Sequence, residues 1–443
     1  MRSKKKVIVG ILAQYLNTRH DVLDLINKLS ENCELFIFLK LHDADIKNKL
    51  NPSIKIKWIT PSNNKYWLFF IKSVYKIFGK IPKSKNNYYI TEMFKISNST
   101  LKNISRNFES LLLSISKIAP KFISYDKYLE LISGKRNTLH PDIDVFFCIT
   151  HIYDDKVYAS MINTGKKVYT YVYSWDHPCK MKCFSKSNNV HYLVWSIGIK
   201  NDLIELHGIK NENIRIFGAT QLMYLQEFEY LLKSRFDIPA KKYDVYIAMA
   251  TGTISLAKQE VTLYEHIIKT LKLINSEITI LIRPYPFLKQ KNIYEPLIKH
   301  SNVTIENNTI DNTETSIDSK ENNFEKYRSI TNAHLFIHCG TTLGLETSYC
   351  NIPVFFIDFC KELELNDLNK FIHQYQNDKY LNIVEYPNVI RSLAQLQVAY
   401  KETLISETKY LDYNYEVRIV TQVQNINQII STLQSFFQDQ DIK

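Results

Sequence analysis

The 443-residue sequence has no uninterrupted apolar stretch of about 18 residues or more, the length that a membrane-spanning helix needs. We therefore expect a soluble or peripheral protein. A basic start, residues 1–6, precedes an apolar stretch at residues 7–13, which is too short for a secretory signal and is followed by no small-residue cleavage site. We expect a strand at residues 7–12 and a cytoplasmic protein, either free or peripheral on the inner face of the membrane.

Three catalytic signatures are also missing. The sequence contains no GxSxG, no HExxH and no GxxxxGK[ST] segment. A serine hydrolase, a zinc protease and a P-loop nucleotidase therefore lack sequence support. No internal repeat of 20 to 50 residues stands out either, which argues against a solenoid or a propeller.

Cysteine is scarce, and its seven copies are odd in number and mostly lie in apolar segments. This pattern predicts reduced, buried thiols in a cytoplasmic protein. Cys179 and Cys183 are spaced CxxxC with His177 and His191 nearby, which raises a zinc site as an alternative. Because a second cysteine pair is missing, we expect no metal there.

Positive charge is in excess. The formal net charge of +11 indicates an acidic partner, namely nucleotide phosphates, anionic lipid headgroups or nucleic acid. The lysines are scattered in an Asn, Ile and Lys-rich background and form no recognisable motif for single strands or for reading a groove. We therefore expect no nucleic-acid partner.

Apolar strand patterns alternate with helical patterns along most of the chain, which predicts α/β domains with parallel sheets covered on both faces. A polar stretch near residues 230–243 separates two such series. The expected parts are a first domain at 1–232 with a helical insertion at about 65–134, a second domain at 243–415, and a C-terminal closing helix at 416–443 that returns to the first domain.

The insertion begins with an aromatic and cationic helical pattern at residues 65–78. Such a helix either rests on a membrane surface, where it would receive a lipid-linked acceptor, or packs on its own sheet. The second interpretation is the more common outcome for helices of this kind.

The segment LFIHCGTTLGLETSYCNIPVFFID at residues 335–358 is the most informative in the chain. It predicts a strand ending at His338, a turn at Gly340-Thr341-Thr342, a short helix and a second strand. A helix N-terminus with two hydroxyls suits a phosphate, and Glu346, four residues after Thr342, lies on the same helix face and suits a ribose diol. The alternative is an ordinary capped helix with a solvated Glu346.

Two further features are expected at the same sheet edge. The small residues 250–253 follow the first strand of the second domain, so Gly252 and Thr253 form a second candidate phosphate loop. Arg283 ends the next strand before Pro284-Tyr285-Pro286 and suits a diphosphate. The alternative for Arg283 is a structural ion pair.

In the first domain, Ser174, Trp175, Asp176 and His177 close a strand. Trp175 either stacks on a sugar or fills the core, while Asp176 and His177 supply an acid and a base. Asp176 either serves as a base or caps the next segment.

The loop after the first strand offers further candidates. Arg19, His20 and Asp21 lie there and are available to contact an acceptor or to act as a general base. Asp154 and Asp155, after the strand that ends at residue 150, form a third acidic candidate.

These motifs resemble those of bacterial glycosyltransferases with the GT-B fold, a superfamily that includes UDP-N-acetylglucosamine 2-epimerases and CDP-glycerol polyol-phosphate transferases. The resemblance runs in order along most of the chain and rests on residues 174–176, 194–196, 206–209, 214–219, 283–286 and 340–346. It implies two Rossmann-like doubly wound domains facing across a cleft, with the donor on the second and the acceptor on the first.

The resemblance also implies residue roles. Gly340, Thr341 and Thr342 would hold the donor phosphates, Glu346 the ribose, and Arg283 the charge on the leaving nucleotide. The expected donor-binding set is completed by Gly252, Thr253 and His338, the acceptor-binding set is Trp175, Arg19 and Ser174, and the catalytic set is Asp176, then Asp21, and His177. Related sequences often carry Asn and His where this chain has His177 and Tyr285, so roles tied to that Asn and His do not carry over.

The expected activity is transfer of a sugar from a nucleotide sugar to a surface glycan such as capsule or lipopolysaccharide. Neither a cofactor nor a metal is expected, because such folds manage the leaving charge with helix dipoles and cations. The two Asp-x-Asp segments, 43–45 and 142–144, are poorly placed as metal sites. The alternatives are a UDP-sugar 2-epimerase, a polyol-phosphate transferase, or a non-catalytic basic binding or scaffold protein.

Overall fold

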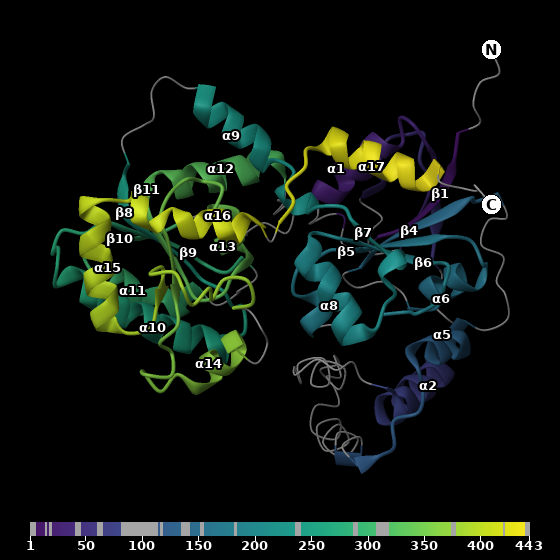
Figure 1. The fold of residues 1–443 in the computed structure, drawn as a ribbon, viewed down its shortest axis with the longest axis horizontal. Helices are drawn as coiled ribbons and strands as arrows, with labels where there is room; N and C mark the ends of the chain where they lie inside the picture. The colour runs from purple at the N-terminus through teal and green to yellow at the C-terminus, as the bar shows by residue number, and fades with distance from the viewer. Residues whose placement is uncertain are drawn as a thin grey trace. The chain divides into compact units, whose positions relative to one another are not determined.

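A computed structural model describes residues 6–13, 16, 20–39, 46–59, 65–80, 114–115, 118–133, 142–150, 155–180, 184–234, 241–286, 291–306, 319–373, 378–419 and 421–438. Within these residues the chain divides into two compact units, each built on its own sheet (Figure 1). Unit 1 comprises Met1–Asn17, Val22–Thr220 and Ile426–Lys443, and unit 2 comprises Thr18–Asp21 and Gln221–Asn425.

The sheet of unit 1 contains seven described strands, all parallel, in the order β3-β2-β1-β4-β5-β6-β7. Its strands are β1 (Ile8–Leu12), β2 (Glu34–Leu39), β3 (Lys55–Trp58), β4 (Val145–Thr150), β5 (Val168–Val172), β6 (Val190–Val194) and β7 (Ile214–Ile216). The central strands β1 and β5 are buried at every residue because helices cover both faces of the sheet. This burial explains why they are continuous apolar runs in the sequence.

Most helices of unit 1 lie between its strands along the chain. They are α1 (His20–Leu29), α2 (Lys65–Phe78), α5 (Tyr125–Ser133), α6 (Asp155–Asn163), α7 (His177–Lys180), α8 (Ile197–His207), the 3₁₀ turns η2 (Asn211–Asn213) and η3 (Thr220–Leu222), and α17 (Ile426–Gln438). In α8, the Ser196 hydroxyl accepts from the Ile199 amide, and Gly208 ends the helix in the left-handed conformation with φ 65°.

The sheet of unit 2 contains six described strands, also parallel, in the order β10-β9-β8-β11-β12-β13. They are β8 (Tyr243–Ala248), β9 (Ile280–Arg283), β10 (Val303–Ile305), β11 (Ala333–His338), β12 (Val354–Ile357) and β13 (Val389–Ile390). In the core, Phe336 of β11 lies opposite Tyr246 of β8, with stacked rings whose centroids are 5.6 Å apart. The predicted α/β fold with two doubly wound sheets is confirmed.

The helices of unit 2 cover both faces of this sheet, and Figure 1 shows α12 on one side and α10 on the other. They are α9 (Leu225–Ser234), α10 (Ile254–Lys272), α11 (Glu295–Ile298), α12 (Lys320–Thr331), α13 (Thr342–Thr347), α14 (Asn366–His373), α15 (Leu393–Ile405) and α16 (Asp412–Ile419), with the 3₁₀ turns η4 (Lys291–Tyr294) and η5 (Thr408–Tyr410).

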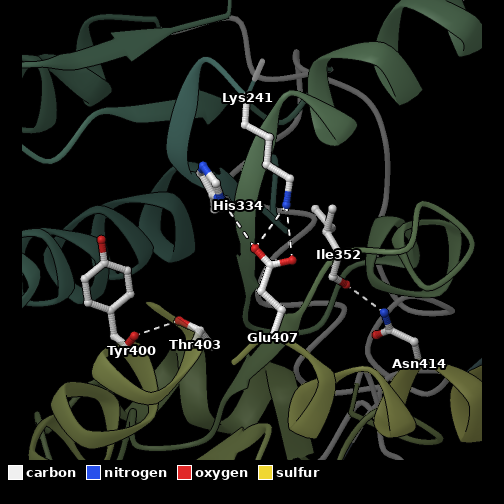
Figure 2. Close-up of polar contacts among 7 residues, drawn as sticks. All are labelled: Lys241, His334, Ile352, Tyr400, Thr403, Glu407 and Asn414. Atoms are coloured by element: carbon white, nitrogen blue, oxygen red, sulfur yellow. Dashed lines mark hydrogen bonds and ion pairs between the residues drawn. The ribbon is translucent and has the colours of Figure 1, made fainter. Parts of the chain in front are cut away.

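A polar cluster lies at the amino edge of the second sheet (Figure 2). Lys241 precedes β8 and His334 lies near the start of β11. The Glu407 carboxylate contacts both, with its Oε1 atom 3.1 Å from the Lys241 amine and 3.3 Å from His334 Nδ1. This cluster lies at the amino ends of the strands, whereas parallel sheets bind ligands at the carboxyl edge. Substitutions in the cluster should therefore not disturb a ligand bound at that edge.

The division into units differs from the predicted boundary after residue 232. Helix α9 belongs to unit 2, because Phe228 packs against Phe324 and Tyr327 of α12 with ring centroids 5.7 and 5.2 Å away. The division between the units therefore lies before α9, at residues 220–221, whereas the polar stretch that suggested the boundary begins within the last turns of α9.

The tail also differs from the single helix predicted at 416–443. Helix α16 ends at Ile419 and belongs to unit 2, where the Asn414 amide donates to the Ile352 carbonyl at 2.6 Å. Helix α17 begins at Ile426 and belongs to unit 1. There the Tyr169 hydroxyl donates to the Phe436 carbonyl at 2.6 Å, and Phe437 packs against Tyr169.

The described part of the predicted insertion consists mainly of α2 and α5. The two helices pack together through aromatic rings, with Tyr75 of α2 stacked on Tyr128 of α5 at 4.5 Å. On α2, Trp67 and Phe70 are 48% and 56% exposed. Residues 81–113, which include much of the predicted insertion, lie outside the described residues.

Candidate functional site

The second sheet has one topological switch point, between β8 and β11. The chain runs from β8 outward to β9 and β10, then returns to β11 and continues in the opposite direction to β12 and β13. The connections that leave β8 and β11 at their carboxyl ends therefore diverge, and such a point is where doubly wound sheets bind ligands. The two predicted phosphate loops, residues 250–253 and 340–342, are the segments that follow these two strands.

The turn after β8 is held by a buried carboxylate from its own helix. Glu260 of α10 is fully buried and accepts hydrogen bonds from the backbone amides of Ala250 at 2.5 Å and Thr251 at 3.3 Å. The Cys339 thiol, which follows β11, donates to the same carboxylate at 3.4 Å. Burial raises the pKa of Glu260 to about 7. Nothing in our sequence analysis singled out this residue.

The turn after β11 is held by a buried imidazole. His338 Nδ1 accepts from the amides of Gly340 at 3.2 Å and Thr341 at 3.5 Å. Burial lowers the pKa of His338 to about 3, so the ring is neutral and keeps the acceptor lone pair on Nδ1. Gly340 has φ 116°, a conformation that favours glycine, so this turn requires it.

These contacts change what the predicted phosphate turn offers. The Gly340 and Thr341 amides donate to His338, and the Thr341 hydroxyl caps α13 by accepting from the Leu343 amide. Helix α13 has only six residues. The structure thus shows the capped-helix alternative for this turn, and a phosphate contact by Gly340, Thr341 and Thr342 stays a prediction.

The loop after β8, residues 250–253, precedes a much longer helix than α13. Helix α10 has 19 residues, and its N-cap residue Thr253 is exposed and makes no side-chain capping bond. The first amides of a helix have no intrahelical acceptor, so this end carries a partial positive charge. Gly252 lies under the Tyr285 ring, because a Cβ atom at position 252 would come within 2.7 Å of it.

Arg283 forms a structural ion pair, as one of the two interpretations predicts. Its guanidinium pairs with Glu306, just after β10, and the same carboxylate oxygen accepts from the Tyr246 hydroxyl at 3.0 Å. Burial lowers the pKa of Arg283, but Tyr246 and Glu306 outweigh it and raise the pKa above its ordinary value. The guanidinium is therefore a fixed positive charge at the end of β9, with its side chain 19% exposed.

Glu346 is also paired instead of solvated. Its carboxylate contacts the Lys326 amine of α12, and both side chains are 11% exposed. The solvated alternative is therefore wrong. A ribose diol would have to share this carboxylate with Lys326, so the predicted ribose contact stays a prediction.

A charged cluster that the sequence did not reveal follows β12. The His373 imidazole at the end of α14 lies between two carboxylates, with Nε2 2.9 Å from Asp358 and Nδ1 2.8 Å from Asp378. Hydrogen bonds to both carboxylates raise the pKa of His373 to about 10. The only sequence signal was an acidic residue directly after an apolar strand.

In unit 1 the switch point lies between β1 and β4, so the residues after these strands are the counterparts of the two loops. Asp21 in the first turn of α1 is fully buried. Arg19 and Asp154 lie outside the described residues, as do the side chains of His177 and Asp155. Predicted roles for these residues stay predictions.

The strand end after β5 is well defined. The Ser174 hydroxyl donates to the half-buried Asp176 carboxylate at 2.5 Å. Trp175 is 2% exposed, which fits the core interpretation better than sugar stacking. The Asp176 backbone carbonyl accepts from the Cys179 amide at 3.1 Å, which is a backbone turn, so the side-chain roles of Asp176 as base or cap stay predictions.

The described residues contain neither a cluster suited to a metal ion nor a membrane-spanning helix. Among the described residues, no three His, Cys, Asp or Glu side chains are grouped so as to hold a metal ion. In the described part of the chain, no helix has the length and apolar character needed to cross a membrane. Cys33, Cys148, Cys179, Cys339, Cys350 and Cys360 are free and buried, as predicted.

Comparison with known proteins gives a result only at the level of structure. No family model matches the sequence, and no curated protein matches it either. A solved structure from Listeria monocytogenes, provisionally assigned as a UDP-N-acetylglucosamine 2-epimerase, superposes with a TM-score of 0.50 at 9% identity, covering 99% of this chain and 98% of that chain. The chain has the GT-B fold.

Two further structures are similar over nearly the whole chain at lower scores. The wall teichoic acid polymerase TagF gives a TM-score of 0.46 at 11% identity, covering 99% of this chain and 90% of that one. Anabaena HepE in complex with UDP gives 0.46 at 10% identity, covering 98% and 100%. With identities this low, the GT-B likeness concerns the fold alone.

Proposed function

We propose that this GT-B protein is a glycosyltransferase that moves a sugar from a nucleotide donor to a surface glycan such as capsule or lipopolysaccharide. The observation that carries the proposal is the switch point of the second sheet. There the free start of a 19-residue helix, a buried turn after β11 and the fixed charge of Arg283 follow neighbouring strands. Positive groups at the carboxyl edge of a doubly wound sheet suit a nucleoside diphosphate.

The donor residues keep the roles that the resemblance implies, with one change of emphasis. Gly252 and Thr253 at the start of α10 bind the phosphates more directly than the turn at residues 340–342, whose amides already donate to His338. Arg283 stabilises the charge that develops on the leaving nucleotide. Glu346 accepts from the ribose hydroxyls while it keeps its ion pair with Lys326.

In the chemical step, the acceptor hydroxyl oxygen attacks the anomeric carbon and the bond from that carbon to the donor phosphate breaks. The phosphate leaves with the bonding electron pair, and a carboxylate takes the proton from the hydroxyl. Asp176 is our first choice for this base and Asp21 our second. Helix dipoles and cations stabilise the leaving group in this scheme, so no metal is required.

We also propose that the acceptor is lipid-linked and that the protein acts at the inner face of the membrane. The support is α2, which presents Trp67 and Phe70 to solvent beside the exposed Lys72 and has no acidic residue in its first turn. Cosedimentation with vesicles containing anionic lipid tests this point. Trp67→Ser/Phe70→Ser should bind such vesicles several-fold more weakly than the parent protein, and unchanged binding would refute the membrane role.

Calorimetric titration with UDP, CMP, CDP and GDP tests the donor claim. UDP leads the set because the Listeria protein of the same fold is assigned to a UDP sugar. We expect micromolar to millimolar binding of one nucleotide, and about a tenfold loss, or about 1.4 kcal/mol, in Arg283→Ala and in Glu346→Gln. The matched control is Glu407→Gln, which removes an ion-paired carboxylate at the amino edge of the same sheet and should leave binding unchanged.

Two outcomes would redirect the assignment. If the protein consumes UDP-N-acetylglucosamine with no acceptor present, it is an epimerase. If it binds none of the four nucleotides while its fold is intact, the glycosyltransferase proposal fails and a non-catalytic binding protein is favoured.

A further inference from the structure

We infer that Glu260 is a positioning residue that holds the two turns at the switch point of the second sheet in one common geometry. The inference rests on the proposed function for its consequence, nucleotide binding, but on the hydrogen bonds around Glu260 for its geometry. Neither the motifs nor the family resemblance involves this residue.

The geometry is that of a bridge between two neighbouring strands. Glu260 Oε1 accepts from the Ala250 amide, two residues beyond β8, and from the Cys339 thiol, one residue beyond β11. Glu260 Oε2 accepts from the Thr251 amide. Because β8 and β11 pair directly, one carboxylate fixes the exits of both connections that diverge there.

Glu260 differs from an ordinary buried acid in its partners. The donors that surround it are two backbone amides and one thiol, and its side chain is fully buried. An acid without a cationic partner is costly to bury. An apolar residue at this position on the buried face of α10 would leave the Ala250 and Thr251 amides without this acceptor, so the carboxylate serves the turns that it contacts.

Glu260 changes charge near neutral pH, whereas the titratable groups that face it do not. Cys339 follows β11, Cys360 follows β12, Tyr264 is on α10 and Tyr294 is in η4, and burial raises the pKa of each. They are therefore neutral at pH 7, whereas burial raises the pKa of Glu260 to about 7. A neutral carboxyl accepts hydrogen bonds more weakly than a carboxylate, so protonation weakens the bridge.

Ionisation of Glu260 should lower the stability of the protein and raise its affinity for the nucleotide. Since the folded pKa of Glu260 lies above the unfolded value, its contribution to stability is full below about pH 4.5 and is lost as pH rises through about 7. The ionised form is the one that accepts from both turns, so nucleotide affinity should rise over the same range. A purely structural residue would make affinity follow stability, and here the two diverge.

The experiment compares the full-length parent protein with Glu260→Gln by calorimetry with UDP between pH 6 and 8.5. We expect the parent affinity to increase several-fold toward pH 8.5. We expect Glu260→Gln to bind about tenfold more weakly at pH 8.5, with no such pH dependence and with an unfolding temperature equal to or above that of the parent. Glu265→Gln, at a partly exposed position of the same helix, is the matched control and should resemble the parent.

Hydrogen exchange separates this inference from the proposed function. In Glu260→Gln, amides of residues 250–251 and 339–341 should exchange faster than in the parent, whether or not any nucleotide binds. Unchanged exchange there, or a Glu260→Gln affinity and pH profile equal to those of the parent, would overturn the inference. If the variant does not fold, faster exchange of these amides in the parent at pH 6 than at pH 8.5, after correction for intrinsic rates, supports it, and an equal corrected rate overturns it.

Discussion

Gly344 of α13 packs directly against the buried ring of His338, and a Cβ atom at position 344 would lie 2.4 Å from His338 Cε1. The helix can approach the end of β11 this closely only with glycine there. We predict that Gly344→Ala destabilises the protein by about 1–3 kcal/mol, the usual range for overpacking a core. Urea denaturation followed by circular dichroism measures the loss.

A double-mutant cycle isolates the contact between the two residues. His338→Ala removes the ring, so Gly344→Ala should cost clearly less in that background than in the parent. Equal costs in the two backgrounds would show that position 344 is constrained by something other than His338.

The Tyr246, Arg283 and Glu306 cluster gives a graded prediction. Tyr246→Phe removes one hydrogen bond and should cost about 1 kcal/mol. Glu306→Ala leaves the Arg283 charge without its carboxylate and should cost about 3–5 kcal/mol. Chemical denaturation of both variants checks the order, and a Tyr246→Phe loss as large as that of Glu306→Ala would contradict it.

The stability difference between the parent and His373→Gln should depend on pH in the alkaline range. Its folded pKa of about 10 lies above the ordinary value of 6.5, so the imidazolium contributes fully below about pH 6.5 and its contribution is lost as pH rises through about 10. His373→Gln should therefore be less stable than the parent at pH 7, and the gap should close near pH 10.5. Thermal unfolding across this range measures the gap.

The control for that series is His334→Gln, a histidine beside the Glu407 carboxylate at the opposite edge of the sheet. It shows how much a histidine-to-glutamine replacement changes the unfolding temperature by itself. A His373→Gln gap that stays constant from pH 7 to pH 10.5 would remove the Asp358–His373–Asp378 interaction as its cause.

A substitution in helix α17 should destabilise strands that lie far from it in the sequence. Phe437 is 1% exposed and packs on Phe147 and Tyr169, so Phe437→Ala should cost about 3–5 kcal/mol. Ser435→Ala, at an exposed position of the same helix, should cost less than about 0.5 kcal/mol. Denaturation followed by hydrogen exchange would locate the loss in the residues of β4 and β5, and a loss confined to unit 2 would contradict the packing.

Much of the fold was predictable because parallel strands are buried on both faces. Strands such as β2 and β4 therefore appear in the sequence as apolar runs of the right length. The two-residue strand β13 was missed because Val389 and Ile390 are too few to form a pattern. The tail was predicted as one helix because the apolar period continues across residues 420–425, where the chain passes from α16 to α17.

The candidate site was predictable in place but not in its internal contacts. Turns after strands mark the carboxyl edge of a sheet, so residues 250–253 and 340–342 were found. The partners of these residues lie elsewhere in the sequence. Lys326 lies twenty residues before Glu346, and Glu306 follows β10, whereas Arg283 ends β9. Glu260 was missed because it lies within α10, beyond the turn at residues 250–253, although an acidic residue among the apolar residues of a helix was itself a signal.

The return of the C-terminal helix to the first sheet has a consequence for biosynthesis. The ring of Phe437 completes a hydrophobic surface made by Phe147 and Tyr169, which are translated nearly three hundred residues earlier. The N-terminal unit therefore cannot close its core while it emerges from the ribosome. Phe147 and Tyr169 lack this packing partner until the second unit and then residues 426–438 have been synthesised.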